Sequence, residues 1–219
     1  MARTSRPLRP PQAASPDLPE QFEAGPRPRR GIALEEVEWA DPRGEFDAPY
    51  ADLSGSRFSG GALDRLDAAH GSLRDLDFDT VQIASLALRG AHLRRVRIRS
   101  SRIGSLDLAD AEVSELIIED CRIDYLSAGR ASAADIDVSR TVFGSLDAPA
   151  ASLTRVRFVD SRVDELDLRE ARNTDVDLRG LDVSHHLDPR GLAGATITSL
   201  QAQLAAASLA TALGVQVRD

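Results

Sequence analysis

The chain has 219 residues, of which 42% are hydrophobic and 28% are charged, and its formal net charge is −8. This length allows one large domain or two small ones, and no stretch approaches the roughly 18 consecutive apolar residues of a membrane span. The single cysteine excludes an internal disulfide framework, and 4% aromatic residues are too few for the stacking platforms that bind single-stranded nucleic acid.

Residues 1–30 form an arm that contains seven Pro and six Arg but few apolar residues. Such a segment cannot bury a core, so we expect it to be disordered and interpret its charge as that of a solvated tail. Met1 to Ala14 lack the apolar run of a secretory signal, which predicts a cytoplasmic protein. Residues 31–50, with Val37 and Trp39, are expected to lead into the next region and cover its first edge.

Residues 51–183 repeat with a period of five. Every fifth residue from Leu53 to Val183 is apolar except Asn173, and the residues two positions earlier, from Ala51 to Leu181, are all uncharged. A helix has a period of 3.6 residues and a strand a period of 2, so neither explains this pattern. A triplet whose first and third residues point inward, followed by two outward residues, fits a coil that turns a corner every five residues.

A longer period of 20 residues is superimposed on the period of five residues. One face carries Leu without exception, and another carries Ala or Gly throughout. The leucines are Leu66, Leu86, Leu106, Leu126, Leu146 and Leu166. Residues 20 apart therefore share one environment and stack along an axis, as in a solenoid. The prediction is an all-β solenoid with four faces per coil and about 6–7 coils of 20 residues.

The repeat unit resembles that of the pentapeptide-repeat family, which reads approximately A-(D/N)-L-x-x. Residues 51–55 (ADLSG) match it directly, and residues 106–110 (LDLAD) and 176–180 (VDLRG) match it loosely. The resemblance implies a right-handed quadrilateral β-helix. This chain departs from the family in one respect, because two of its faces carry large residues where the family favours small ones.

The C-terminal region is expected to form a loop at 184–194, then a helix and tail at 195–219. Thr198 can cap the helix N-terminus and Gly214 can end it, and residues 199–213 carry no charge. One face of this helix can seal the last coil. Another can meet a second copy of the chain, as the family resemblance implies, so we expect a homodimer. The dimerisation residues are predicted to be Leu204, Leu209, Leu213 and Val215.

Residues able to perform chemistry are few. His185, His186 and Asp188 suggest a fragment of a metal site but lack a fourth donor, so we interpret them as a surface loop. Cys121 falls in an inward small-residue position and is interpreted as a core residue. The sequence contains no Gly-rich phosphate loop and no hydrolase or zinc-protease motif. We therefore expect a non-enzymatic protein without catalytic, cofactor or metal sites.

Charged residues mark the outward positions. Signs mostly alternate between residues 20 apart, which predicts ladders of ion pairs between neighbouring coils. Residues 80–106 contain a basic band from Arg89 to Arg102 and no acid, whereas residues 107–124 are strongly acidic.

Regular acidic residues on a rod also resemble the DNA-mimicking members of the family. Those members dimerise and occupy the DNA-binding surface of DNA gyrase or topoisomerase IV, and some protect these enzymes from quinolones. The resemblance implies that carboxylates replace phosphates before the enzyme's basic residues. The corresponding partner-binding candidates in this sequence are Asp107, Asp147, Asp164, Glu165 and Asp167.

Two functions follow from these patterns. The first is a rigid scaffold that binds an unidentified protein partner through patterned charge. The alternative is a DNA-mimic modulator of type II topoisomerases. The excess of acids over arginines in the repeat region disfavours direct nucleic-acid binding.

Overall fold

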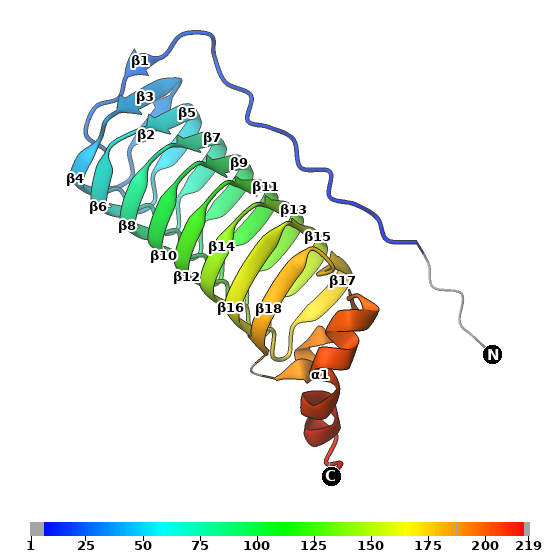
Figure 1. Ribbon diagram of the computed structural model, residues 1–219. Helices are drawn as coiled ribbons and strands as arrows, with labels where there is room; N and C mark the ends of the chain where they lie inside the picture. The colour runs from blue at the N-terminus through cyan, green and yellow to red at the C-terminus, as the bar shows by residue number, and fades with distance from the viewer. Residues whose placement is uncertain (1–6, 187, 217–219) are drawn as a thin grey trace.

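The computed structural model describes residues 7–186 and 188–216, and their architecture is a parallel all-β solenoid of about 8 turns that ends in one helix (Figure 1). The described strands form two long sheets of 11 and 8 strands, and from β3 (Val37–Ala40) onward successive strands alternate between the two sheets. Each coil contributes one strand to each sheet, so the two sheets are opposite walls of the rod. This confirms the solenoid that the five-residue period predicts.

The strands of the 11-stranded sheet are β1 (Glu23–Ala24), β2 (Ala33–Glu35), β3 (Val37–Ala40), β5 (Asp52–Ser59), β7 (Ser72–Asp79), β9 (His92–Arg99), β11 (Glu112–Glu119), β13 (Ser132–Ser139), β15 (Ser152–Val159), β17 (Arg172–Asp177) and β19 (Ala195–Thr196). The strands of the 8-stranded sheet are β4 (Arg43–Asp47), β6 (Ala62–Asp67), β8 (Gln82–Ala87), β10 (Arg102–Asp107), β12 (Arg122–Ser127), β14 (Val142–Asp147), β16 (Ser161–Asp167) and β18 (Leu181–His186).

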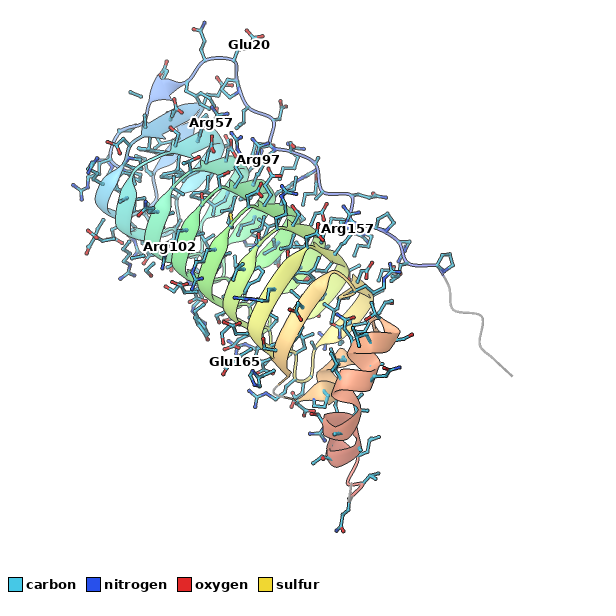
Figure 2. The ribbon with its side chains drawn as sticks, viewed as in Figure 1. Glu20, Arg57, Arg97, Arg102, Arg157 and Glu165 are labelled. Carbon is cyan, nitrogen blue, oxygen red and sulfur yellow. The ribbon has the colours of Figure 1, made fainter. Side chains whose placement is uncertain are left out.

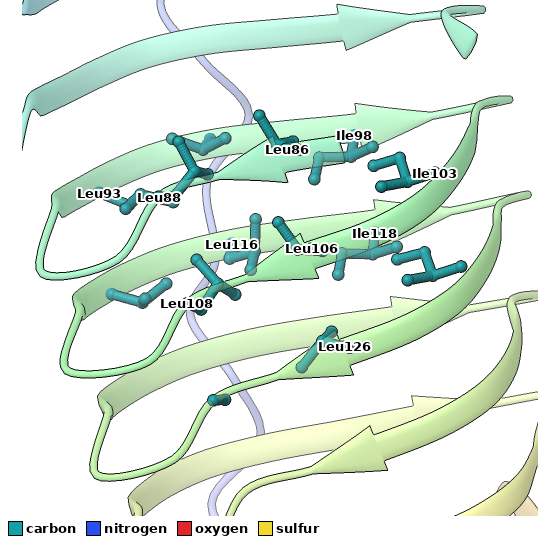
Figure 3. Packing of buried hydrophobic residues seen from close by; sticks show 14 of the residues in the cluster. Leu86, Leu88, Leu93, Ile98, Ile103, Leu106, Leu108, Leu116, Ile118 and Leu126 are labelled. Carbon is teal, nitrogen blue, oxygen red and sulfur yellow. The ribbon is translucent and has the colours of Figure 1, made fainter. Parts of the chain in front are cut away.

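Each strand pairs in register with the strand that lies one coil further along the chain. Leu86, Leu106 and Leu126 are direct partners on β8, β10 and β12, and all three are buried. Figure 3 shows these leucines stacked along the axis beside a second column that contains Ile98 and Ile118. Because an inward side chain meets only the coils above and below it, the longer of the two predicted periods corresponds to the geometry of the core.

The corners of each coil use backbone in the left-handed region. In the 11-stranded sheet the long strands bend at residues such as Asp75 (φ 54°) and Arg95 (φ 52°), which are skipped in the strand register. Non-glycine residues adopt this conformation at an energetic cost of about 1–2 kcal/mol each. In the 8-stranded sheet the register also skips positions such as Ala84 and Gly104, which divides each strand, but the backbone at these positions is not left-handed. Each coil therefore has four faces.

The N-terminal lead-in is itself a coil of the solenoid. β2 and β3 pair with β5, and β4 pairs with β6. Up to Gly44, the two residues of each pair are separated in the sequence by one residue fewer than the paired residues of later coils. A register shift at Gly44/Glu45 restores the usual separation of 20 residues. Because of this shift, the five-residue period counted from Leu53 does not continue into the first coil. The expected 6–7 coils therefore increase to about 8.

Aromatic side chains close the N-terminal end of the core. The rings of Trp39 and Phe58 stack with centroids 4.4 Å apart, and Phe58 stacks on Phe78 at 5.0 Å. Trp39 Nε1 donates a hydrogen bond to the Pro26 carbonyl oxygen at 2.8 Å, which ties the preceding chain to this stack. The large rings keep water from the first inward positions.

The expectation of a disordered arm is wrong for residues 7–30. Residues 1–6 lie outside the described residues, but residues 7–22 extend along the side of the solenoid and β1 pairs with β3 (Figure 1). Composition predicts disorder because the arm has no core of its own. It is ordered here because the surface of the rod supplies hydrogen-bond acceptors to its backbone, which composition does not show.

The C-terminal end is closed by a 3₁₀ helix, η1 (Pro189–Leu192), and by β19, after which α1 (Ser199–Ala212) leaves the rod. Thr198 caps α1 through a capping box with Gln201, as its position predicts. Gln201 Nε2 also donates to the carbonyl oxygens of Leu178 and Leu181, both at 2.8 Å. Among the described residues no helix is long and apolar enough to cross a membrane.

Leu106→Ala tests the inward assignment of the leucine column. Leu106 is buried between Leu86 and Leu126, so its truncation should lower the free energy of unfolding by about 2–5 kcal/mol through lost burial and a residual cavity. Urea unfolding followed by circular dichroism measures this change. Stability equal to that of the wild type would contradict the assignment.

Candidate partner-binding surface

The five acidic candidates all lie on the 8-stranded sheet. Asp107 ends β10, Asp147 ends β14 and Asp167 ends β16, where Asp147 and Asp167 are direct partners on neighbouring strands. Asp164 and Glu165 lie earlier on β16. The fold therefore brings the candidates to one wall of the rod, as the stacking of coils requires.

Two of these aspartates are committed to the fold. Asp107 Oδ1 accepts a hydrogen bond from Ala109 N at 3.0 Å, and Asp167 Oδ1 accepts one from Arg169 N at 2.9 Å. This carboxylate-to-backbone bond closes the turn that follows each strand. Asp167 is also paired with the Arg169 guanidinium at 2.7 Å and only 3% of its side chain is exposed, so it does not face a partner.

The remaining candidates lie on the two strands that follow an exposed aromatic residue, which the sequence did not single out. Tyr125 on β12 is 43% exposed and lies in register between Ser105 and Ser145. Hydrogen bonding to the Asp147 carboxylate, with a smaller contribution from burial, raises the pKa of the Tyr125 phenol. A small side chain on each neighbouring strand leaves the ring standing above the sheet.

We call this surface the Tyr125 patch and define it as Ser105, Tyr125, Ser145, Asp147, Asp164 and Glu165. The Asp164 side chain is 57% exposed, and Ser145 Oγ donates to Glu165 Oε2 at 3.3 Å. Figure 2 shows Glu165 and Arg102 on the wall away from the arm. A signal for Tyr125 exists in the sequence, because it is the one Tyr, Phe or Trp in a series, one residue per coil, that otherwise reads Glu45, Arg65, Ser85, Ser105, Ser145, Glu165 and His185.

The predicted ladders of ion pairs neutralise the basic band. Its arginines bind acids on neighbouring coils, and the pairs lie on both walls of the rod. They include Arg89–Asp107 (3.1 Å), Arg95–Asp75 (2.6 Å), Arg97–Asp77 (2.9 Å), Arg99–Asp79 (2.7 Å) and Arg102–Asp124 (3.7 Å). The basic band is therefore compensated by acids of the coil before it, such as Asp75, as well as by acids of the following coils, such as Asp107.

The densest of these clusters surrounds Asp77, which is fully buried on the wall opposite the Tyr125 patch. Arg97 donates to it through Nε at 2.9 Å and Nη2 at 3.0 Å, Arg57 through Nε at 3.3 Å and Arg99 through Nη2 at 3.4 Å. Burial disfavours the charged carboxylate, but the Arg97 hydrogen bonds and the surrounding guanidinium charges outweigh burial and lower the pKa of Asp77.

The groups considered for chemistry are separated from one another. Over the described ranges, no group of three or more His, Cys, Asp and Glu residues could hold a metal ion. Cys121 is buried, as predicted, and its thiol donates to the Glu119 carbonyl oxygen at 3.1 Å. Burial raises the pKa of this thiol to about 11, which opposes formation of the reactive thiolate. A cavity of about 80 Å³ inside the rod has an entirely apolar lining that includes Ala128, Ala148 and Phe143.

The predicted dimerisation residues lie on α1 and just after it. Leu204 is 76% exposed, Leu213 is 74% exposed, Val215 is exposed and Leu209 is half-buried. Leu200 is exposed as well, although we expected one face of the helix to seal the last coil. Only Ala205 is buried within the helix, so most of its apolar surface faces solvent.

Comparisons with known proteins concern the fold. No family model matches the chain and no curated protein matches its sequence. One similar solved structure is HetL, a pentapeptide repeat protein involved in heterocyst differentiation regulation from the cyanobacterium Nostoc sp. strain PCC 7120. It is 17% identical with a TM-score of 0.38, over 78% of this chain and 89% of HetL.

Two trypsin-treated variants of QnrB1, a plasmid-mediated fluoroquinolone resistance protein, are also similar. They are 18% and 17% identical with TM-scores of 0.37 and 0.31, over 87% and 86% of this chain and 99% of each of theirs. At this low similarity, these structures add nothing to the fold assignment, which rests on the strand pairing of this chain. The five-residue faces and the in-register pairing of successive coils define the architecture.

The chain folds as a parallel β-helix with five-residue faces. A β-helix of this kind offers walls rather than clefts, because its inward side chains fill the rod. Its candidate functional surfaces are therefore the Tyr125 patch on one wall, the column of corner residues beneath the arm, and the exposed side of α1.

Asp77→Asn tests the buried cluster. The substitution removes a negative charge that faces three guanidinium groups, so the free energy of unfolding at pH 7 should fall by about 3–5 kcal/mol. Because the folded pKa of Asp77 is lowered, its contribution is present above its ordinary value of 3.8 and is lost as the pH falls through the folded value. The difference between variant and wild type should therefore shrink below about pH 4.

Urea unfolding at pH 7 and pH 3 measures both effects. Asp79→Asn is the matched control, because Asp79 belongs to the same cluster but is partly exposed. If Asp77→Asn were as stable as the wild type at pH 7, the carboxylate would not hold the cluster together.

Proposed function

We propose that this β-helix is a non-enzymatic cytoplasmic scaffold that binds a protein partner through the Tyr125 patch. The observation that carries the proposal is an exposed tyrosine on β12, in the middle of the 8-stranded sheet, which lies on the side of the rod away from the arm (Figure 1). Tyrosine is enriched among residues that dominate binding energy, because it combines a large rigid ring with a polar hydroxyl. The small residues around it allow a partner to approach closely.

The carboxylates of the patch define the chemistry of the partner. Asp147, which hydrogen bonds the Tyr125 phenol, and Glu165 place negative charge on this wall, and the Asp164 carboxylate lies 3.8 Å from the Arg162 guanidinium. Acids of the opposite wall, such as Asp75 and Asp77, are paired within ladders. A partner with basic side chains around an apolar pocket would be complementary to this arrangement. The rigidity of the stacked coils supports the proposal, because little conformational entropy is lost on binding.

The scaffold proposal is tested with Tyr125→Ala in partner capture by cross-linking and mass spectrometry. We expect the wild type to enrich a partner that Tyr125→Ala loses. Tyr50→Ala is the matched control, because Tyr50 is similarly exposed and lies outside the patch. Enrichment of the same proteins by Tyr125→Ala would overturn the proposal.

The second candidate is a DNA-mimic modulator of DNA gyrase or topoisomerase IV. The observation that favours it is the position of Asp147, Asp164 and Glu165 at the end of the rod that bears α1, where a dimer would join two acidic surfaces. Asp107 and Asp167 contribute less to such a surface, because each bonds an arginine of its own chain.

A gyrase supercoiling assay tests this candidate. We expect inhibition by the wild type that is lost in the triple variant Asp147→Asn, Asp164→Asn and Glu165→Gln. A control triple, Glu35→Gln, Asp52→Asn and Glu112→Gln, makes the same charge change on the other sheet. Absence of inhibition by the wild type at tens of micromolar, about the weakest affinity that would serve a regulator, would exclude the DNA-mimic role.

We also propose that α1 and Val215 form a homodimer interface, because their exposed leucines lack cover among the described residues. Sedimentation should give twice the chain mass of 23.6 kDa for the wild type. Leu204→Glu should sediment as a monomer, whereas Gln203→Glu, which adds the same charge at an exposed polar position, should not. A monomeric wild type would refute the interface.

A further inference from the structure

The arm lies along one outward column of the β-helix, which we call the corner rail. The rail consists of the outward residues at the bends of the long strands, namely Asp75, Arg95, Glu115, Asp135, Arg155 and Asp175. Figure 1 shows the arm running beside the rod from the β1 end toward the β17 end. Figure 2 shows Arg57, Arg97 and Arg157 on the same side of the rod as the arm.

The aspartates of the rail accept hydrogen bonds from the backbone of the arm. These bonds run from Asp17 N to Asp75 Oδ1 (2.9 Å), from Gln12 N to Asp135 Oδ1 (2.9 Å) and from Arg9 N to Asp175 Oδ1 (3.4 Å). The pKa of Asp135 is lowered chiefly by the Arg155 guanidinium and further by the Gln12 N–H. A backbone donor is common to all residues except proline, so these contacts recognise chain direction and spacing rather than side chains.

The spacing of the donors matches the spacing of the coils. Asp175 and Asp135 are two coils apart, or about 9.6 Å at about 4.8 Å per strand, and three arm residues with the polyproline II rise of about 3.1 Å span about 9.3 Å. Asp135 and Asp75 are three coils apart, about 14.4 Å, and five arm residues span about 15.5 Å. The length of three residues in a proline-rich segment is therefore close to the length of two coils of the rod.

An arginine of the arm also continues the ladder at its end. Arg95 binds Asp75 and Arg155 binds Asp135, in each case from the following coil. The chain that follows β17 on this wall has Gly194 and Ala195 here, where earlier coils carry an arginine. Arg9 provides a guanidinium instead, through Nε to Asp175 Oδ2 at 2.8 Å.

The apolar side of the arm faces the rod without filling the space beneath it. Leu8, Pro11, Pro16 and Pro19 are half-buried, and the Phe22 ring lies 4.8 Å from the Arg57 guanidinium carbon. At the Arg9 end a pocket remains between Pro10 and Pro11 on one side and Arg157, Asp177 and Arg179 on the other. A segment with larger side chains at these positions could occupy the rail more fully.

We propose that the corner rail is a peptide-binding site for extended, proline-rich, arginine-bearing segments of a protein partner, and that residues 7–22 are its exchangeable resident. The resident lies on the surface, pairs with no strand over residues 7–22 and is held by side-chain acceptors at three points. A segment already in the polyproline II conformation loses little entropy on binding. The site is separate from the Tyr125 patch and does not depend on it.

Substitution of arm residues by proline isolates the backbone donors. Gln12→Pro and Asp17→Pro each delete one N–H that bonds the rail while keeping the segment extended, and Arg9→Ala removes the guanidinium. Ala14→Pro is the matched control, because the Ala14 N–H makes none of the three bonds to the rail aspartates. Amide hydrogen exchange should show Gln12 protected in the wild type and in Ala14→Pro, and exposed in Asp135→Ala, which removes the acceptor oxygen.

Binding in trans then tests exchange, with a fluorescent synthetic peptide of residues 7–22 as the probe. The full-length triple variant Arg9→Ala, Gln12→Pro and Asp17→Pro should bind the peptide at least roughly tenfold more tightly than the wild type, whose resident arm competes at high effective concentration. Adding Asp135→Ala and Asp175→Ala to that variant, which removes both acceptors, should abolish the gain. A peptide carrying Ala14→Pro should bind as well as the unchanged peptide, and one carrying Gln12→Pro should bind less tightly.

Three results would overturn the proposal. Equal peptide binding by the wild type and the triple variant would show that the arm does not compete for the rail. Unchanged binding after loss of the Asp135 and Asp175 carboxylates would place the peptide elsewhere. Unprotected exchange of the Gln12 amide in the wild type would show that the arm does not occupy the rail in solution.

Discussion

In-register stacking of successive coils is the constraint on which the molecule depends. Each side chain of the repeat meets its counterparts in the coils before and after it, at a strand separation of about 4.8 Å. Inside the rod this produces columns such as Leu86, Leu106 and Leu126. On the outer surface of the rod, the same stacking brings charged side chains so close that like charges would repel each other. The outward columns therefore mostly alternate in sign, as in Asp75 and Arg95.

This constraint also decides which surfaces are free to bind. A charge inside an alternating ladder is neutralised by its neighbours and contributes little to a field at a distance. The surfaces that remain are those where the ladder is interrupted. At the Tyr125 patch an aromatic ring and small residues replace charged ones, and at Asp175 the ladder of the rod ends and Arg9 of the arm continues it. Both lie on walls of the rod, because its interior is filled by apolar side chains.

The two ends of the rod are closed in different ways. At the N-terminal end Trp39 stacks on Phe58 within a complete additional coil, so the core is covered by the chain itself. At the C-terminal end η1, β19 and the first turn of α1 meet the last coil, and the rest of the helix exposes Leu204 and Leu213. The exposed leucines therefore lie at one end of the rod, which is where an interface between two copies would join two rods in line.

The sequence alone determined the solenoid, its four faces, the inward leucines and the capped C-terminal helix, because each of these depends on spacing along the chain. Its five-residue count missed the first coil, where the spacing between Leu34 and Leu53 is one position short and changes the frame. It also identified the wall that carries Asp107, Asp147 and Asp167. It could not separate carboxylates that close turns, such as Asp167, from those that face solvent, such as Asp164, because both occupy outward positions.

Only the tertiary structure decided the fate of the arm and the prominence of Tyr125. Residues 7–22 lack a core of their own, so their order depends on acceptors that are distant in sequence, such as Asp75 for Asp17. Tyr125 stands out because Ser105 and Ser145 flank it on neighbouring strands, a relation that exists only once the coils are stacked. The period of the sequence predicts whether a side chain points into or out of the rod. The exposure of that side chain and its contacts depend on the residues that neighbouring coils and the arm place beside it.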